Sequence, residues 1–271
     1  MSRAIILCAD DYAHSLPISR AILELAANKR ISALSCMTPS EHWRAHGPWL
    51  SDVRDRVDIG LHITLVDEVP LTKMPHTAPD GRLPNIKTMI LRSYLGLLDL
   101  QEIAVEIRAQ IDAFESVLGF SPAHIDGHLH THVLPGIRDV LLNATAKMNP
   151  RPWWRNINDN VPGILKRGIA APKAIFLSAL GRRFAHTDVA MNDGFSGIYA
   201  FSPANSNYSA LFERFVIAAG KQHLIMCHPG ESGDDAAHAG LRGGEYAFLK
   251  STAFTECLGR HDLRLGRFAE T

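Results

Sequence analysis

The sequence of 271 residues lacks an apolar run long enough to cross a membrane. Residues 4–9 form a short apolar run near the N-terminus, but two carboxylates follow it, whereas a secretory signal needs a longer apolar core. The sequence also lacks an excess of either charge, because 28 Lys and Arg residues balance 28 Asp and Glu residues. Nothing therefore favours nucleic acid or an anionic membrane surface as a partner. We expect a cytoplasmic protein without a membrane span.

Cysteine is scarce, and none of the four cysteines belongs to a CxxC pair. Cys8, Cys36 and Cys227 stand in apolar runs typical of buried strands, where a small thiol behaves as an apolar side chain. We expect neither disulfides nor cysteine ligands, as is usual in a reducing compartment. A Gly-rich phosphate loop is also missing after the first apolar run, which counts against a nucleotide-binding doubly wound fold.

Short apolar runs alternate with segments of helical periodicity from end to end. Such runs predict strands buried on both faces, as in a parallel sheet, at residues 4–9, 31–37, 57–64, 123–127 and 223–227. The clearest amphipathic helix is predicted over residues 100–118, closed by Gly119. No linker or internal repeat interrupts the alternation, so we predict one α/β domain over residues 1–271.

Three segments do not follow this alternation of predicted strands and helices. Residues 66–88 contain four prolines and an Asp-Gly pair, which predict a loop without a helix of its own. Loops of this length are usually functional, so we interpret it as one wall of a substrate groove, with a plain surface insertion as the alternative. The adjacent Trp153 and Trp154, followed by Arg155, predict either a sugar-stacking platform or large core residues. Residues 231–244 are Gly-rich and polar, which predicts a second irregular segment.

Polar side chains stand at or just past the C-terminal ends of four predicted strands: Asp10 and Asp11, His62, His128, and His228. Delivery of catalytic groups by the C-terminal ends of several strands is typical of a closed barrel. An open sheet would instead gather them at a switch point in the strand order. The pattern therefore favours a (β/α) barrel over an open sheet.

The most unusual stretch is residues 124–132, where His124, Asp126, His128, His130 and His132 occupy every second position. In an extended chain, all five side chains would line one face. Imidazole nitrogen is a good ligand for Zn²⁺ and related ions, so we predict a metal site. A catalytic site needs about three protein ligands and an open position, so not all five are ligands. The alternatives are a solvated His-rich loop or buried histidines satisfied by the backbone.

An Asp with two His residues makes a mixed oxygen and nitrogen set for a divalent ion. Such an ion polarises a carbonyl group and lowers the pKa of water. The adjacent Asp10 and Asp11 cannot point the same way on a regular strand, so one can be a ligand and the other a general base. His228, from another strand, could protonate a leaving group. These groups together predict metal-assisted hydrolysis.

Five motifs, in order, carry a resemblance to a known family: Ala9-Asp10-Asp11-Tyr12, Ile59-Gly60-Leu61-His62, Pro70-Leu71-Thr72, His124-Ile125-Asp126-Gly127-His128 with His130 and His132, and Cys227-His228-Pro229. Together they resemble the YdjC-like carbohydrate (chitooligosaccharide) deacetylases, a family that includes hopanoid-associated relatives. The resemblance implies a single-domain irregular (β/α) barrel of the TIM-like or NodB-like deacetylase type. It also implies removal of the acetyl group, by metal-activated water, from an N-acetylglucosamine-containing oligosaccharide or glycoconjugate.

Carried over by position, the resemblance implies that Asp11, His62 and His128 hold one divalent ion, Mg²⁺ or Zn²⁺. Asp10 would then be the base and His228 the acid. The remaining motif residues are expected to contact the substrate or to support the ligands: Tyr12, Asp126, His130 and His132. The sequence departs from the family at Ala13, where Gly is usual, which puts the first substrate contacts in doubt.

Two other functions fit the same residues less well. A phosphoesterase on the same barrel predicts a basic phosphate clamp, for which the sequence offers no obvious candidate. A non-catalytic sugar-binding relative predicts the loss of a ligand or of the base, yet all five groups are present. The pattern leaves the sugar, its chain length and homodimer formation open.

Overall fold

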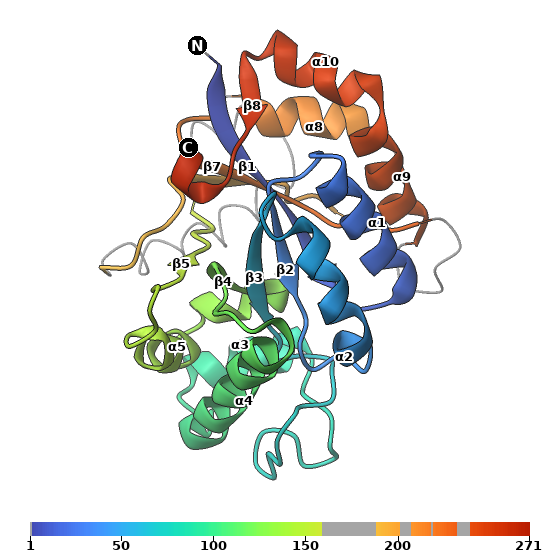
Figure 1. Cartoon of the computed structure of the whole chain (residues 1–271). Helices are drawn as coiled ribbons and strands as arrows, with labels where there is room; N and C mark the ends of the chain where they lie inside the picture. The colour runs from blue at the N-terminus through green and yellow to red at the C-terminus, as the bar shows by residue number, and fades with distance from the viewer. Residues whose placement is uncertain (1, 159–187, 201–206, 218, 232–238) are drawn as a thin grey trace.

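A computed structural model describes residues 2–158, 188–200, 207–217, 219–231 and 239–271. Parallel strands curl into a half-barrel in the order β5-β4-β3-β2-β1-β7-β6, and β8 pairs with β1 (Figure 1). The strands are β1 (Arg3–Tyr12), β2 (Ala33–Cys36), β3 (Asp58–Ile63), β4 (His124–Gly127), β5 (Trp153–Trp154), β6 (Gly194–Ser196), β7 (His223–Cys227) and β8 (Leu263–Leu265). A parallel bridge between Trp154 and Met191 links the two edges of the sheet. The predicted irregular barrel is confirmed.

Helices surround this sheet (Figure 1). They are α1 (Leu16–Ala27), α2 (Trp43–His46), α3 (Ile86–Tyr94), α4 (Leu100–Leu118), α5 (Ile137–Thr145), α8 (Tyr208–Val216), α9 (Ala239–Lys250) and α10 (Thr252–Arg260), with 3₁₀ turns η1 (Gly47–Val53), η2 (His128–Val133) and η4 (Phe268–Glu270). The predicted helix over residues 100–118 is α4, which Asp99 caps and Gly119 closes in the left-handed region at φ 74°. Within the described ranges, no helix has the length and apolar character that a membrane span requires.

Strand β1 is an interior strand of the sheet, and its sequence is apolar on both faces, as a strand covered on both sides requires. Residues 5–9 are fully buried, with β2 on one side and β7 on the other. Both flanking strands are parallel to β1, so their carboxyl ends reach the same end of the barrel. The residues that follow these strands are therefore brought together.

The long proline-rich segment has no helix before Ile86, as predicted, but α3 begins within its last residues. Glu106 of α4 fixes the segment, because its carboxylate accepts hydrogen bonds from the backbone N–H groups of Leu71 and Thr72. The wall that this region gives to the cavity described below is formed by Ile86 and Ile90 of α3. That helix was not predicted.

The expectation of an irregular segment over residues 231–244 is wrong from Ala239 onward, where α9 begins. Glycine weakens an isolated helix, but tertiary contacts routinely override that preference. Here the buried side chains of Arg242 and Glu245 bind the ends of neighbouring strands and hold the helix in place.

We predict that Gly60→Ala destabilises the protein. Gly60 lies on β3, and a Cβ atom there would stand 2.2 Å from Nε2 of the fully buried His124 ring. The ring would have to shift inside a packed core, at a cost of about 1–3 kcal/mol. Urea unfolding of the variant should show a lower midpoint than that of the unmodified protein.

Gly259→Ala is the matched control, because a Cβ atom on this α10 residue would meet nothing within 4 Å. Alanine is favoured over glycine in a helix by roughly 0.5–1 kcal/mol, so the control should unfold at an equal or higher midpoint. A Gly60→Ala midpoint as high as the control's would contradict the prediction.

Candidate active site

The carboxyl ends of β1, β3, β4 and β7 meet around a cavity of about 370 Å³. Its polar lining comes from Asp10, His62, His128, His130 and His228. Its apolar lining includes Ile86, Ile90, Leu129, Ile198, Tyr199 and Met226. The cavity therefore has a cluster of titratable groups on one part of its lining and apolar side chains on another, which can contact the C–H groups of a ligand.

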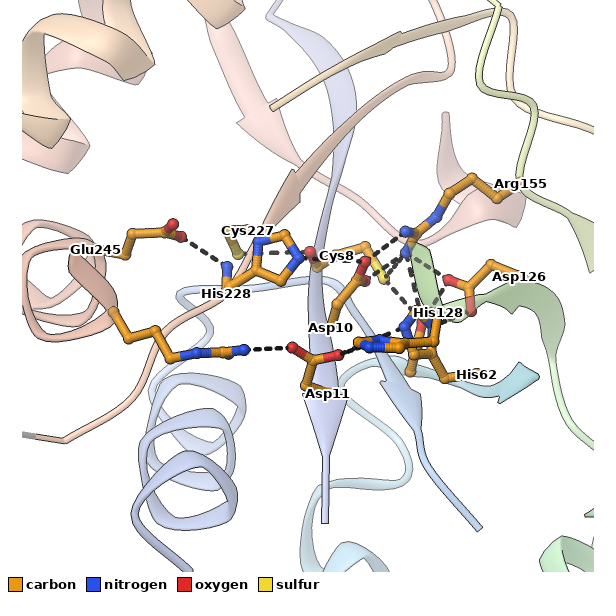
Figure 2. Close-up of polar contacts among 12 residues, drawn as sticks. Cys8, Asp10, Asp11, His62, Asp126, His128, Arg155, Cys227, His228 and Glu245 are labelled. Atoms are coloured by element: carbon orange, nitrogen blue, oxygen red, sulfur yellow. Dashed lines mark hydrogen bonds and ion pairs between the residues drawn. The ribbon is translucent and has the colours of Figure 1, made fainter. Parts of the chain in front are cut away.

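A backbone irregularity at the end of β1 separates the two adjacent carboxylates. Asp11 has φ 70°, in the left-handed region, and the pairing register with β2 shifts between Ala9 and Tyr12. Asp10 consequently faces Arg155, whereas Asp11 faces His62 and His128 (Figure 2). The two carboxylates therefore point in different directions, as the sequence argument requires.

Asp11, His62 and His128 bring three potential ligand atoms together. Asp11 Oδ1 lies 3.1 Å from His128 Nδ1 and 3.5 Å from His62 Nε2. All three atoms lie within 4.8 Å of one another. One carboxylate oxygen with two imidazole nitrogens is a donor set that suits a divalent ion. The residues present therefore fit such an ion.

Asp126 supports this cluster from behind. Its Oδ1 lies 2.7 Å from Nδ1 of His62, the ring nitrogen that faces away from Asp11. A carboxylate at this position fixes the orientation of an imidazole whose other nitrogen binds a metal.

The protonation of the cluster follows from these contacts. Burial alone lowers the pKa of His62, but Asp126 and Asp11 outweigh it and raise the pKa to about 10. Burial alone raises the pKa of Asp11, but Arg242 and His128 outweigh it and hold the pKa well below its ordinary value. At neutral pH, a protonated His62 therefore lies between two carboxylates.

Arg155 is a site residue that the sequence pattern does not identify. Its fully buried guanidinium donates to both oxygens of Asp10, at 2.6 and 2.5 Å, and lies 2.5 Å from Asp126 Oδ2 (Figure 2). The only local signal is a charged residue directly after a short apolar strand. Trp153 and Trp154, which precede it, are buried, so they are core residues and not a sugar platform.

The expectation that residues 124–132 line one face is wrong beyond Gly127. Strand β4 ends there, and Leu129 and His130 adopt φ 50° and φ 62° in the turn η2. His124 and His132 are fully buried, with Nε2 2.9 Å from Ser35 Oγ and 3.0 Å from the Arg155 carbonyl oxygen, respectively. Burial lowers the pKa of each to about 4. His132 thus matches the alternative of a buried histidine bonded to the backbone, whereas the buried His124 bonds a serine side chain instead. His128 and His130 line the cavity.

Tyr12 and Ala13 also belong to the framework. The Tyr12 hydroxyl donates to the His46 carbonyl oxygen at 2.7 Å, and its ring is buried. Ala13 has φ 72°, a conformation that is strained for a residue with a Cβ atom. This strain gives a physical reason for glycine as the usual residue there.

His228 follows β7 and completes the polar wall. Its Nε2 lies 4.0 Å from Asp10 Oδ2, and its backbone N–H donates to Glu245 Oε2 at 2.7 Å (Figure 2). Burial lowers the pKa of its imidazole to about 4, although Asp11 and Asp10 oppose this shift. The ring is therefore neutral at pH 7 before a substrate binds.

Comparison with known proteins gives three results. A family model described as YdjC-like protein matches residues 4–260. Chitooligosaccharide deacetylases of Yersinia pestis (strain Pestoides F) and Yersinia pseudotuberculosis serotype O:1b (strain IP 31758) are each 35% identical over 138 residues, 51% of this chain and 53% of theirs. The chain thus spans about half the length of the curated relatives it matches. A crystal structure of a protein from Enterococcus faecalis V583, described as a candidate cellobiose-phosphate cleavage protein, aligns over 99% of this chain and 98% of its own. The TM-score is 0.73 and the sequence identity is 19%, so this similarity shows the fold alone.

The protonated His62 leads to a prediction about metal binding. A divalent ion needs the neutral imidazole, so Zn²⁺ binding near neutral pH should release about one proton per ion. Because the pKa of His62 is about 10 without metal, the affinity should rise as the pH is raised toward that value. Calorimetric titrations in two buffers of different ionisation enthalpy measure the proton count. Identical heats in both buffers would show that His62 does not lose a proton.

Arg155→Met should destabilise the fold strongly at pH 7, by about 3–5 kcal/mol, because it leaves two buried carboxylates without their cation. Burial alone raises the pKa of Asp126, and Arg155 and His62 lower it well below the ordinary value. A lowered carboxyl pKa stabilises the fold above the unfolded pKa, and this contribution is lost as the pH falls. The difference between variant and unmodified protein should therefore shrink on acidification.

Urea unfolding at several pH values measures this difference. Arg151→Met is the matched control, since Arg151 pairs with Asp188 at the surface, where ion pairs contribute about 0–1 kcal/mol. An equal loss of unfolding free energy in the two variants would show that the buried ion pairs of Arg155 stabilise the protein no more than a surface ion pair does.

Proposed function

The chain belongs to the YdjC-like protein family, and on that premise we propose that it is a metal-dependent hydrolase that removes the acetyl group from an N-acetylated sugar. One observation carries this proposal. Two adjacent carboxylates at the end of β1 diverge, so that Asp11 faces two histidines while Asp10 faces the same cavity beside His228. A ligand set, a base and an acid are thus available around one bound group.

Asp11, His62 and His128 would hold the ion, and Asp126 would fix the orientation of His62. A bound Mg²⁺ or Zn²⁺ would polarise the acetamide carbonyl and lower the pKa of a water molecule. The donor set suits either ion, and the choice between them stays open.

Asp10 is proposed as the base that takes a proton from the attacking water. The fork of Arg155 fixes both of its oxygens, so the carboxylate keeps one orientation while each oxygen retains a lone pair. Arg155 is therefore a positioning residue in this scheme.

His228 is proposed as the acid that protonates the departing amine. Its imidazole is neutral at pH 7, so it needs a proton during the reaction. Asp10 Oδ2, 4.0 Å from Nε2, is the nearby group that has just received one. Transfer from Asp10 to His228 and then to the amine nitrogen accompanies cleavage of the C–N bond and leaves acetic acid and a free amine. The acid then passes its proton to the amine or to solvent and becomes acetate.

The cavity lining supports a sugar as the substrate. Ile86, Ile90 and Leu129 offer an apolar wall to the acetyl methyl group and the C–H face of a sugar ring, and His130 offers a polar contact. An N-acetylglucosamine-containing oligosaccharide or glycoconjugate meets these requirements. Phosphoester hydrolysis is less well supported, because no Lys or Arg stands among the described residues that line the cavity.

We expect metal-stripped protein to release acetate from N-acetylglucosamine oligomers or conjugates only after Zn²⁺ or Mg²⁺ is restored. Asp10→Asn should lower this rate by about 10²–10⁴-fold with metal affinity retained, since it removes a base but no ligand. His128→Ala should lose both activity and metal. An acetate assay on a substrate panel and calorimetric metal titration measure the two properties.

Two results would contradict this proposal. Full activity in either variant would refute the assigned roles. Stoichiometric metal binding without acetate release from any acetylated sugar would exclude deacetylation and point to another hydrolysis or to sugar binding.

A further inference from the structure

Two ionisable side chains of α9, three residues apart, reach the ends of two different strands. Arg242 Nη2 donates to Asp11 Oδ2 at 2.6 Å, and Glu245 Oε2 accepts the backbone N–H of His228 at 2.7 Å. Both residues are buried. Arg242 forms a buried ion pair with Asp11, and the Glu245 carboxyl group accepts hydrogen bonds, so both buried polar groups are satisfied. Buried polar groups are costly unless they are paired or hydrogen-bonded, so these contacts fix the position of the helix relative to β1 and β7.

We propose that α9 is the positioning element of the site: Arg242 aligns Asp11 as a metal ligand, and Glu245 aligns His228 as the acid. This inference rests on the proposed function. It assigns roles to two residues that touch neither the reacting atoms nor the ion.

Because of Arg242, the two oxygens of Asp11 have different partners. Oδ2 accepts from the guanidinium, and Oδ1 faces His62 and His128. The carboxylate therefore presents a single oxygen to an ion. Without Arg242 it could rotate, and the three donor atoms would no longer be held together before the ion binds.

Glu245, three residues further along α9, acts on the segment that follows β7. Its carboxylate accepts the backbone N–H of His228 and the hydroxyl of Tyr199, a residue that lines the cavity after β6. Figure 2 shows Glu245 beside His228 and away from Asp11. One carboxylate thus joins the segments that follow β6 and β7.

Close packing between α9 and Gly230 makes this arrangement rigid. The Gly230 backbone N–H donates to the Arg242 carbonyl oxygen at 3.2 Å. A Cβ atom at Gly230 would lie 3.3 Å from both Arg242 Cβ and Ile18 Cγ1, so only glycine fits without displacement. The His228-Pro229-Gly230 segment is therefore bound to α9 through backbone and side chain alike.

The test compares Zn²⁺ affinity with turnover in variants of the full chain. Arg242→Met should weaken Zn²⁺ binding by about 10–100-fold, the usual effect of losing a group that orients a ligand. Arg242→Lys, which keeps the charge, should recover part of that loss. Glu245→Leu should leave Zn²⁺ affinity unchanged and lower kcat by about 10-fold with little change in KM, and Glu245→Gln should restore kcat because its amide oxygen still accepts the His228 N–H.

Lys250→Met is the matched control, because Lys250 lies on the same helix and pairs with Glu24 at the surface. It should change neither Zn²⁺ affinity nor kcat. Circular dichroism and urea midpoints show which variants are folded. Unchanged Zn²⁺ affinity in folded Arg242→Met would overturn the proposal, as would parallel losses of affinity, kcat and stability in both α9 variants.

The same experiment separates this inference from the proposed function. Unmodified protein that binds Zn²⁺ but releases no acetate would contradict deacetylation, and the affinity of Arg242→Met would still decide the role of α9. Unmodified protein that binds no Zn²⁺ would overturn both.

Discussion

The buried ion pairs of Arg155 with Asp10 and Asp126 are the constraint on which the rest of the site depends. All three side chains lie in the interior, where an unpaired charge would cost several kcal/mol. Through Asp126 the guanidinium fixes His62, and it also fixes Asp10, whose Oδ2 lies 4.0 Å from the His228 ring. Loss of this one cation would therefore disturb the ligand side and the acid–base side of the cavity together.

The charges of the site also constrain its chemistry. Three carboxylates, those of Asp10, Asp11 and Asp126, face three cations, Arg155, Arg242 and protonated His62. A divalent ion that replaces the His62 proton would leave one excess positive charge in a desolvated cavity. Such an excess favours negative charge that develops during attack on a carbonyl group. The charges named here balance without an ion, and under the proposed function an ion would make the site suited to an oxyanion.

The sequence predicts the parts of this arrangement that depend on local pattern. Apolar runs locate β1 and β7, helical periodicity locates α4, and the polar residues at strand ends identify Asp10, Asp11, His62, His128 and His228. Parallel strands bring such residues together whatever the intervening chain does, which is why strand ends are informative.

Long-range contacts explain what the sequence does not predict. Arg155 lies 145 residues from Asp10, and Arg242 lies 231 residues from Asp11, so no local pattern joins either pair. The alternation of His residues in 124–132 fails for a different reason. Leu129 and His130 adopt positive φ without a glycine to signal the turn, and the packing of His124 and His132 in the core overrides the local pattern.

The two arginines give the adjacent aspartates different surroundings, which supports the different roles proposed for them. Both oxygens of Asp10 accept hydrogen bonds from the fork of Arg155, so both are already shared with one buried cation, although each keeps a lone pair. Asp11 gives one oxygen to Arg242 and keeps the other toward two histidines. The left-handed backbone at Asp11 sets the directions of the two side chains. Each arginine then determines how many oxygens of its aspartate are bound to a guanidinium: both in Asp10 and one in Asp11. The proposed base and the proposed ligand are chemically identical carboxylates, so their different cationic partners are what distinguishes them.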